Sequence, residues 1–100
     1  MTPKSFNPGR LLATPSLLSA VPYDRLLKCF MEHLRGSWGD ALSHEDWSLN
    51  NQSTHDGSRL LSAYYIDQHS PEKGKFWILT DAEDDNGIRQ ATTCLLPEEY

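Results

Sequence analysis

The sequence predicts an α+β domain: a three- to four-stranded antiparallel sheet, mainly a C-terminal meander, with two main helices packed on one face. Three observations predict it. One hundred residues, 38% of them apolar, suit a single domain over residues 1–100 with one core. The segment 22–36 repeats its apolar residues with a helical period. After residue 57, three apolar segments alternate with turn residues, as strands do.

The first elements are short. Residues 9–14, GRLLAT, predict an extended segment that can add an edge strand to the sheet. Thr14 suits a helix cap and Pro15 the first helical position, which predicts a short helix. In 22–36, which Gly36 ends, apolar residues follow the i, i+3, i+4, i+7, i+8, i+11 pattern of one buried helical stripe. The stripe consists of Tyr23, Leu26, Leu27, Phe30, Met31 and Leu34.

The segment 37–47, SWGDALSHEDW, predicts the start of a second helix. Ser43 followed by acidic residues is typical of a helix start, and Gly57 is typical of its C-terminal stop. Trp47 is expected to be the main apolar anchor, largely buried against the sheet, with Asn50 on the same face. In the alternative, a recognition surface, Trp47 is exposed and contributes to a complex instead of the core.

The remaining segments predict a meander. Residues 58–67, 74–81 and 88–96 are rich in apolar and aromatic residues. A Pro/Gly turn joins the first two, and a loop with Asn86-Gly87, a strong hairpin signal, joins the last two. This arrangement favours consecutive antiparallel strands.

The aromatic residues predict an exposed patch. Neighbours on a strand point to opposite faces, so one of Tyr64 and Tyr65 should leave the core side, and the same holds for Phe76 and Trp77. With helices on one face only, aromatic side chains then appear on the other face, where they suit a protein partner. The alternative is that residues 1–20 cover that face.

No catalytic or metal-binding motif stands out. The histidines lack the spacing of a zinc site, and His33 is expected at the rim of the helical stripe. Cys29 and Cys94 are expected to be buried thiols of a reducing compartment, with Cys94 a core residue and not a nucleophile. The acidic loop 81–87 lacks the Gly and Glu of a calcium loop, which favours a solvated hairpin over a weak cation site. The sequence therefore predicts no catalytic residue, metal or cofactor.

The net charge of −5 is unevenly distributed. Residues 1–35 hold five basic and two acidic side chains, whereas residues 36–100 hold four basic and twelve acidic ones. Without a basic stripe, direct nucleic-acid binding is disfavoured. The acidic part either faces a basic protein partner or only keeps a small domain in solution.

Targeting signals are not evident. No apolar run approaches the ~18–20 residues that span a bilayer, and the N-terminus lacks the apolar region of a signal peptide. A cytoplasmic protein without membrane association is expected.

Several segments carry a family resemblance. SWGDALSHEDWSLNN, GSRLLSAYYI, KFWILTDAE and ATTCLLPEEY resemble a family of small, uncharacterised bacterial proteins from plasmid-related and phage-derived regions. The resemblance covers most of the chain from residue 10 to residue 100. Its most specific parts are Trp38-Gly39-Asp40, Glu45-Asp46 with Asn50, Gly57 with Arg59, and the terminal segments 91–93 and 95–100. Some members are labelled "type I restriction enzyme subunit M". The label does not fit, because a modification subunit needs a cofactor-binding domain larger than this chain and the N-P-P-[FY] signature is absent.

The resemblance implies that the gene for this chain lies near mobile elements and host-defence genes. With the acidic charge, it predicts a non-enzymatic protein-binding module, most concretely an anti-restriction or anti-CRISPR inhibitor of a host nuclease. One alternative is a homodimer with a structural or regulatory role, formed through a strand edge or the aromatic face. The other is a small enzyme of unrecognised type, built on Asp40, Glu45, Asp46, Arg59 and a histidine. The candidate partner-binding residues are Trp38, Asp40, Glu45, Asp46, Tyr64, Asp81, Glu83, Asp84 and Asp85.

Overall fold

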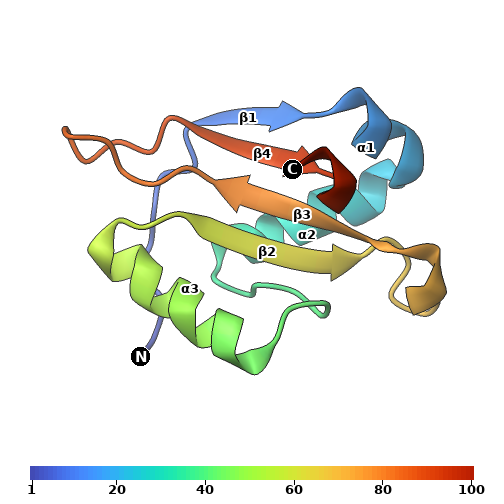
Figure 1. Cartoon of the computed structure of the whole chain (residues 1–100), viewed down its shortest axis with the longest axis horizontal. Helices are drawn as coiled ribbons and strands as arrows, with labels where there is room; N and C mark the ends of the chain where they lie inside the picture. The colour runs from blue at the N-terminus through green and yellow to red at the C-terminus, as the bar shows by residue number, and fades with distance from the viewer.

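The computed structural model describes all residues 1–100 and contains three α-helices and one four-stranded sheet (Figure 1). The predicted α+β class is confirmed. The chain also contains two short 3-10 turns: η1 (Pro71–Lys73) follows the second strand, and η2 (Pro97–Glu99) follows the fourth. The main elements are β1 (Arg10–Ala13), α1 (Pro15–Ala20), α2 (Tyr23–Leu34), α3 (His44–Asp56), β2 (Leu60–Tyr65), β3 (Lys75–Thr80) and β4 (Ala91–Leu95).

The sheet has the strand order β1-β4-β3-β2. The predicted antiparallel meander of β2, β3 and β4 is confirmed, with Leu60 opposite Thr80 and Ile78 opposite Cys94. The edge strand β1 runs parallel to β4, so the sheet is mixed and the prediction of a wholly antiparallel sheet is wrong at this edge. No hairpin links β1 to the meander. Three helices and two strands separate β1 from β4 in the chain. They form the long crossover connection that a parallel pair of strands requires.

The core lies between the sheet and α2. In Figure 1, α2 lies behind the sheet, whose other face is turned toward the viewer. Alternation along β3 is as predicted, since Phe76 and Ile78 are buried while Trp77 and Leu79 are half-buried on the opposite face. The main core cluster consists of Leu17, Val21, Cys29, Tyr64, Phe76, Ile78 and Cys94.

The buried side of α2 differs from the predicted stripe. Its two fully buried side chains are Cys29 and His33. Tyr23, Leu27 and Met31, which the periodicity placed in the core, are 71%, 50% and 48% exposed. The prediction is wrong on this flank because β1, the strand next to it, has only four residues and covers little of the helix.

His33, expected at the rim, is instead the centre of a buried polar network. Its Nε2 lies 2.8 Å from Thr80 Oγ1, which lies 2.7 Å from Thr92 Oγ1. Thr92 donates to the carbonyl of Pro8 (2.7 Å), a group that can only accept. Thr80 therefore donates to Thr92, and His33 donates from Nε2. Its Nδ1 accepts from the hydroxyl of Ser62, so a neutral ring satisfies the whole network.

The second predicted helix is confirmed as α3. The Ser43 hydroxyl accepts from the N–H of Asp46 (3.2 Å), and Gly57 ends the helix in the left-handed region with φ 84°. Trp47 is partly exposed and is not among the buried core residues, so the prediction that Trp47 is the main anchor against the sheet is wrong. Trp38, expected in the preceding loop, is the tryptophan that is 0% exposed, because the loop folds under the edge of the sheet.

Candidate functional site

The outer edge of β2 is closed by the segment before α3 and by α3 itself. The N–H of Ala63 donates to the carbonyl of Trp38 (3.0 Å), and the N–H of Ala41 donates to the carbonyl of Ala63 (3.1 Å). In the second turn of α3, the Asn50 amide donates to the carbonyl of Leu61 (2.6 Å) and accepts from its N–H (3.1 Å). A free strand edge invites pairing with another chain, and these contacts remove it.

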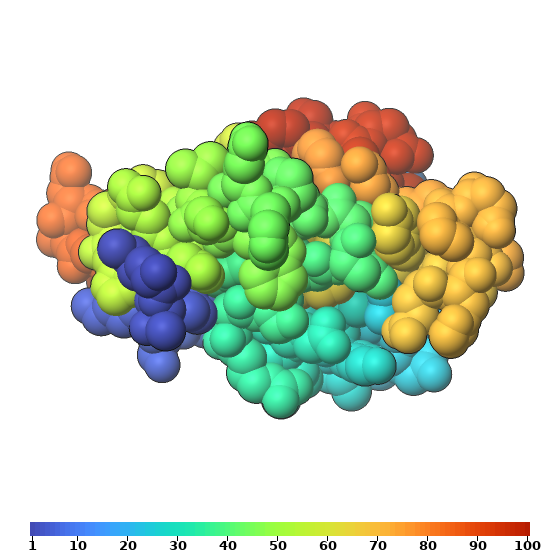
Figure 2. Space-filling view, turned by 90° about the horizontal axis from the view of Figure 1, so that it is seen from below, coloured from blue at the N-terminus to red at the C-terminus, as the bar shows by residue number.

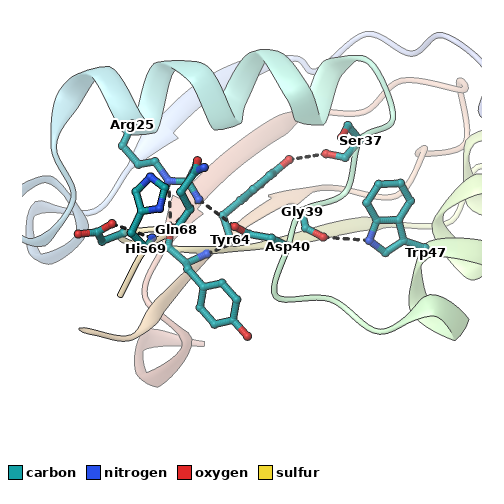
Figure 3. A network of polar contacts seen from close by, with 10 residues as sticks. Arg25, Ser37, Gly39, Asp40, Trp47, Tyr64, Gln68 and His69 are labelled. Carbon is teal, nitrogen blue, oxygen red and sulfur yellow. Dashed lines mark hydrogen bonds and ion pairs between the residues drawn. The ribbon is translucent and has the colours of Figure 1, made fainter. Parts of the chain in front are cut away.

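Arg25 and Asp40 bind the backbone of Tyr65, the last residue of this edge (Figure 3). The N–H of Tyr65 donates to Asp40 Oδ1 (3.0 Å), and its carbonyl accepts from Nε and a terminal nitrogen of Arg25 (3.0 and 2.8 Å). Arg25 and Asp40 form an ion pair at 3.3 Å. We call residues 37–41, with Arg25 and Asn50, the edge cover.

Gly39 makes the close approach of the edge cover possible. It adopts φ 108°, and a Cβ at this position would lie 1.9 Å from the carbonyl oxygen of Ala63. The indole Nε1 of Trp47 donates to the carbonyl of Gly39 (3.0 Å), as Figure 3 shows. The segment 37–47 is therefore both a helix start and a cover for the β2 edge.

Two of the candidate partner-binding residues lie in the interior. Trp38 is 0% and Tyr64 1% exposed. Trp38 donates from Nε1 to Asn51 (2.8 Å), and the Tyr64 hydroxyl donates to the carbonyl of Ser37 (2.7 Å). Burial raises the pKa of Tyr64 well above its usual range. Neither side chain can reach a partner on the surface, which corrects their assignment.

Apart from Asp40, which belongs to the edge cover, the acidic candidates form two separate groups. Glu45 and Asp46 lie in the first turn of α3, exposed. The exposed loop between β3 and β4 projects beyond the other end of this helix (Figure 2) and carries the second group. A helix of 13 residues separates the groups by about 20 Å. The second group consists of Asp81, Glu83, Asp84 and Asp85.

The residues named for the enzyme alternative do not converge in one site, because Asp46 and Arg59 line one groove while Asp40 and His33 lie elsewhere. Asp40 pairs with Arg25 in the edge cover. Asp46 and Arg59 line a groove on the other side of α3, and His33 is buried among hydroxyl groups. No three His, Cys, Asp or Glu side chains lie close enough to hold a metal ion.

The two thiols are buried and unpaired, as predicted. Burial raises the pKa of Cys29 to about 12 and that of Cys94 to about 11. Both therefore stay protonated at neutral pH, which removes the activation that a nucleophilic cysteine needs.

The sheet face opposite α2 has no helix over it. We call its residues Leu61, Tyr65, Trp77, Leu79, Thr93 and Leu95 the open face; all except Leu95 are half-buried, and the exposed Lys75 and Leu12 lie at its margins. The C-terminal turn covers part of it, with Tyr100 packed edge-on against Trp77 at 5.6 Å between ring centroids. The alternative that residues 1–20 cover this face does not hold.

The N-terminal segment lies on the α2 side. Phe6 packs against His33 and Trp38, at 5.6 and 6.2 Å between ring centroids, and Leu17 belongs to the core cluster. The aromatic side chains on the other face are therefore Tyr65 and Trp77, with Tyr100 packed against Trp77, while Tyr64 and Phe76 face α2.

The open face continues onto α3. Leu49 is 58% exposed, and a groove of about 480 Å³ between α3 and β2 is lined by Leu49, Leu61, Asp46 and Arg59, among others. The sequence reasoning missed Leu49. A signal existed, because Leu49 and Trp47 are the only large apolar residues of this helix and Leu49 lies away from the side of Trp47.

No family model, curated protein or solved structure matches the chain. The resemblance to small plasmid- and phage-associated proteins therefore stays a prediction. None of the helices is long and apolar enough to cross a membrane.

Proposed function

We propose that this chain is a protein-binding module whose contact surface is the open face together with Leu49. The observation that carries the proposal is an apolar sheet face without a covering helix, continuous with an exposed leucine and bordered by charged side chains, among them Asp46 and Arg59. Apolar patches rimmed by polar residues are typical of protein interaction sites. Trp77 and Tyr100 supply the large aromatic groups that act as anchors in such sites.

The charge supports a basic partner. Acidic side chains stand at both ends of α3, and the chain carries a net charge of −5. Opposite charge speeds association and suppresses wrong partners. The most concrete version is an inhibitor of a bacterial restriction or CRISPR nuclease, whose basic nucleic-acid-binding surface the chain occupies. The family resemblance supports this version, and two unpaired buried thiols fit a cytoplasmic setting.

Affinity capture from a bacterial lysate, with two matched variants, tests the proposal. Leu49→Asp places a charge beside the open face, whereas Leu27→Asp places the same charge on α2, behind the sheet. The two leucines are 58% and 50% exposed, so neither change opens the core. The wild type and Leu27→Asp should retain the same proteins, which Leu49→Asp loses, and retention should weaken with salt.

With the captured protein purified, Leu49→Asp should raise the Kd by about tenfold or more. Equal loss of binding in both variants, or no loss in either, would show that the open face is not the contact surface.

A further inference from the structure

The two edges of the sheet differ. The edge cover closes β2, but no element lies beyond β1, and all four residues of β1 are exposed. The N–H groups of Arg10 and Thr14 donate toward β4, to the carbonyls of Gln90 (3.0 Å) and Cys94 (3.1 Å). In a parallel ladder, alternate residues bond to the same neighbour. The N–H and C=O groups of the residues between them, Leu11 and Ala13, therefore point outward.

An apolar groove lies directly beneath this free edge. It measures about 190 Å³, and no charged side chain lines it. Leu11 forms its upper wall and is 58% exposed. Tyr23 and Leu27 of α2 form its lower wall and are 71% and 50% exposed, and Met31 lies one turn further along the helix at 48%. A free strand edge beside exposed apolar groups is the arrangement that soluble proteins normally avoid.

We propose that a second copy of this chain covers this site. The two β1 strands pair antiparallel about a twofold axis at Leu12, and the exposed flanks of the two α2 helices pack together beneath them. The proposal does not depend on the function proposed above, because it uses the opposite edge of the sheet and does not involve Leu49.

The backbone of β1 is complementary to itself in this register. With the axis at Leu12, Leu11 lies opposite the partner's Ala13, and Ala13 lies opposite the partner's Leu11. These are the residues whose N–H and C=O groups point outward, and each such pair exchanges both N–H···O bonds. The Leu12 side chains, 43% exposed in the single chain, then meet each other across the axis. A twofold interface requires such a self-complementary surface.

The charges are complementary as well. Arg10 lies opposite the partner's Thr14, which remains extended with φ −76° and ψ 151°. The hydroxyl of Thr14 donates to Glu99 Oε1 at 2.7 Å. Each Arg10 is thus brought next to the Glu99 of the partner subunit. Neither residue takes part in an ion pair within its own chain, so the pairing adds two such contacts by symmetry.

The surfaces that the association would cover are a strand edge of four residues and one flank of a 12-residue helix. The association would form one continuous sheet in which no apolar edge stays free.

Sedimentation equilibrium of the full chain at micromolar concentration tests the proposal. The wild type should sediment with twice the chain mass of 11.4 kDa. Leu27→Asp should raise the dimer dissociation constant by about tenfold or more, while Leu49→Asp, on the other side of the molecule, leaves it unchanged. Ala13→Pro provides a second disruption, since it removes an N–H that β4 does not use.

A charge exchange tests the register. Arg10→Glu should raise the dissociation constant by about tenfold, and adding Glu99→Arg should restore it. A double variant no better than Arg10→Glu alone would overturn the register. A monomeric wild type, or a dimer that Leu49→Asp breaks and Leu27→Asp does not, would overturn the proposed interface. Neither result would bear on capture of another protein by the open face.

Discussion

The two tryptophans flanking the α3 start differ in what they stabilise. Trp38 is 0% exposed, and its indole N–H is hydrogen-bonded inside the molecule, so Trp38→Ala should lower the free energy of unfolding by about 3–5 kcal/mol. Trp47 is half-buried, so Trp47→Ala should cost less, about 1–2 kcal/mol. Urea unfolding of both variants measures the difference. Equal losses, or a larger loss at Trp47, would contradict the assignment of Trp38 as the core anchor.

The buried network of His33 makes stability depend on pH. Burial lowers the pKa of His33 to about 3, whereas the same side chain titrates near 6.5 in the unfolded chain. Between these values only the unfolded chain gains the proton. The contribution to the free energy of unfolding is therefore complete above pH 6.5 and is lost as the pH falls toward 3. We expect a loss of about 2 kcal/mol between pH 7 and pH 5, measured by urea unfolding at both values.

His33→Asn supplies the control, because asparagine cannot titrate. The exposed histidines remain in the variant, so its stability should change little between the same two pH values, whatever its starting stability. An equal loss in variant and wild type would assign the effect to other groups.

The sequence could predict residues whose role is local, and not those whose role depends on distant contacts. Ser43 and Gly57 were predictable because a cap and a helix stop depend on a few neighbouring residues. His33 was not, because its hydroxyl partners come from strands 29 and 47 residues further along the chain.

At the level of elements, the edge cover depends on a glycine. Gly39→Ala should lower the free energy of unfolding by about 3 kcal/mol or more, since the new Cβ would collide with the carbonyl of Ala63 and force the cover away from β2. Gly74→Ala is the matched control. Gly74 also has a positive φ (100°), but its nearest atom is 3.8 Å from the new Cβ. The control should therefore show only the backbone cost, about 1–2 kcal/mol.

Urea unfolding of the two alanine variants separates the collision from the backbone cost. Similar losses in both would mean that the contact between residues 37–41 and β2 is looser than the structure shows.

The existence of most elements was predictable, but two features of their arrangement were not. The apolar pattern of residues 9–14 predicts an extended segment, yet nothing local determines whether it pairs parallel or antiparallel with β4. The stripe on α2 predicts a helix, yet its burial depends on how much of the sheet lies above it. Because β1 has only four residues, the flank carrying Leu27 stays exposed.

At the level of the whole molecule, the structure has one closed and one free sheet edge, and one covered and one open sheet face. The sequence predicted that aromatic side chains would appear on the uncovered face. It could not tell which ones, because alternation fixes that Tyr64 and Tyr65 point apart and leaves open which of them faces α2. The charge distribution predicted the acidic candidates. It could not predict that they would lie in two groups at opposite ends of α3.

Amide hydrogen exchange, resolved by residue with NMR spectroscopy, most directly measures this asymmetry between the two edges. In the Leu27→Asp variant, which should be monomeric, the amides of Leu61 and Ala63 should exchange only through global unfolding, because Asn50 and Trp38 accept from them. Those of Leu11 and Ala13 should exchange orders of magnitude faster. Fast exchange at Leu61 and Ala63 would show that the β2 edge is not closed and would contradict the arrangement described here.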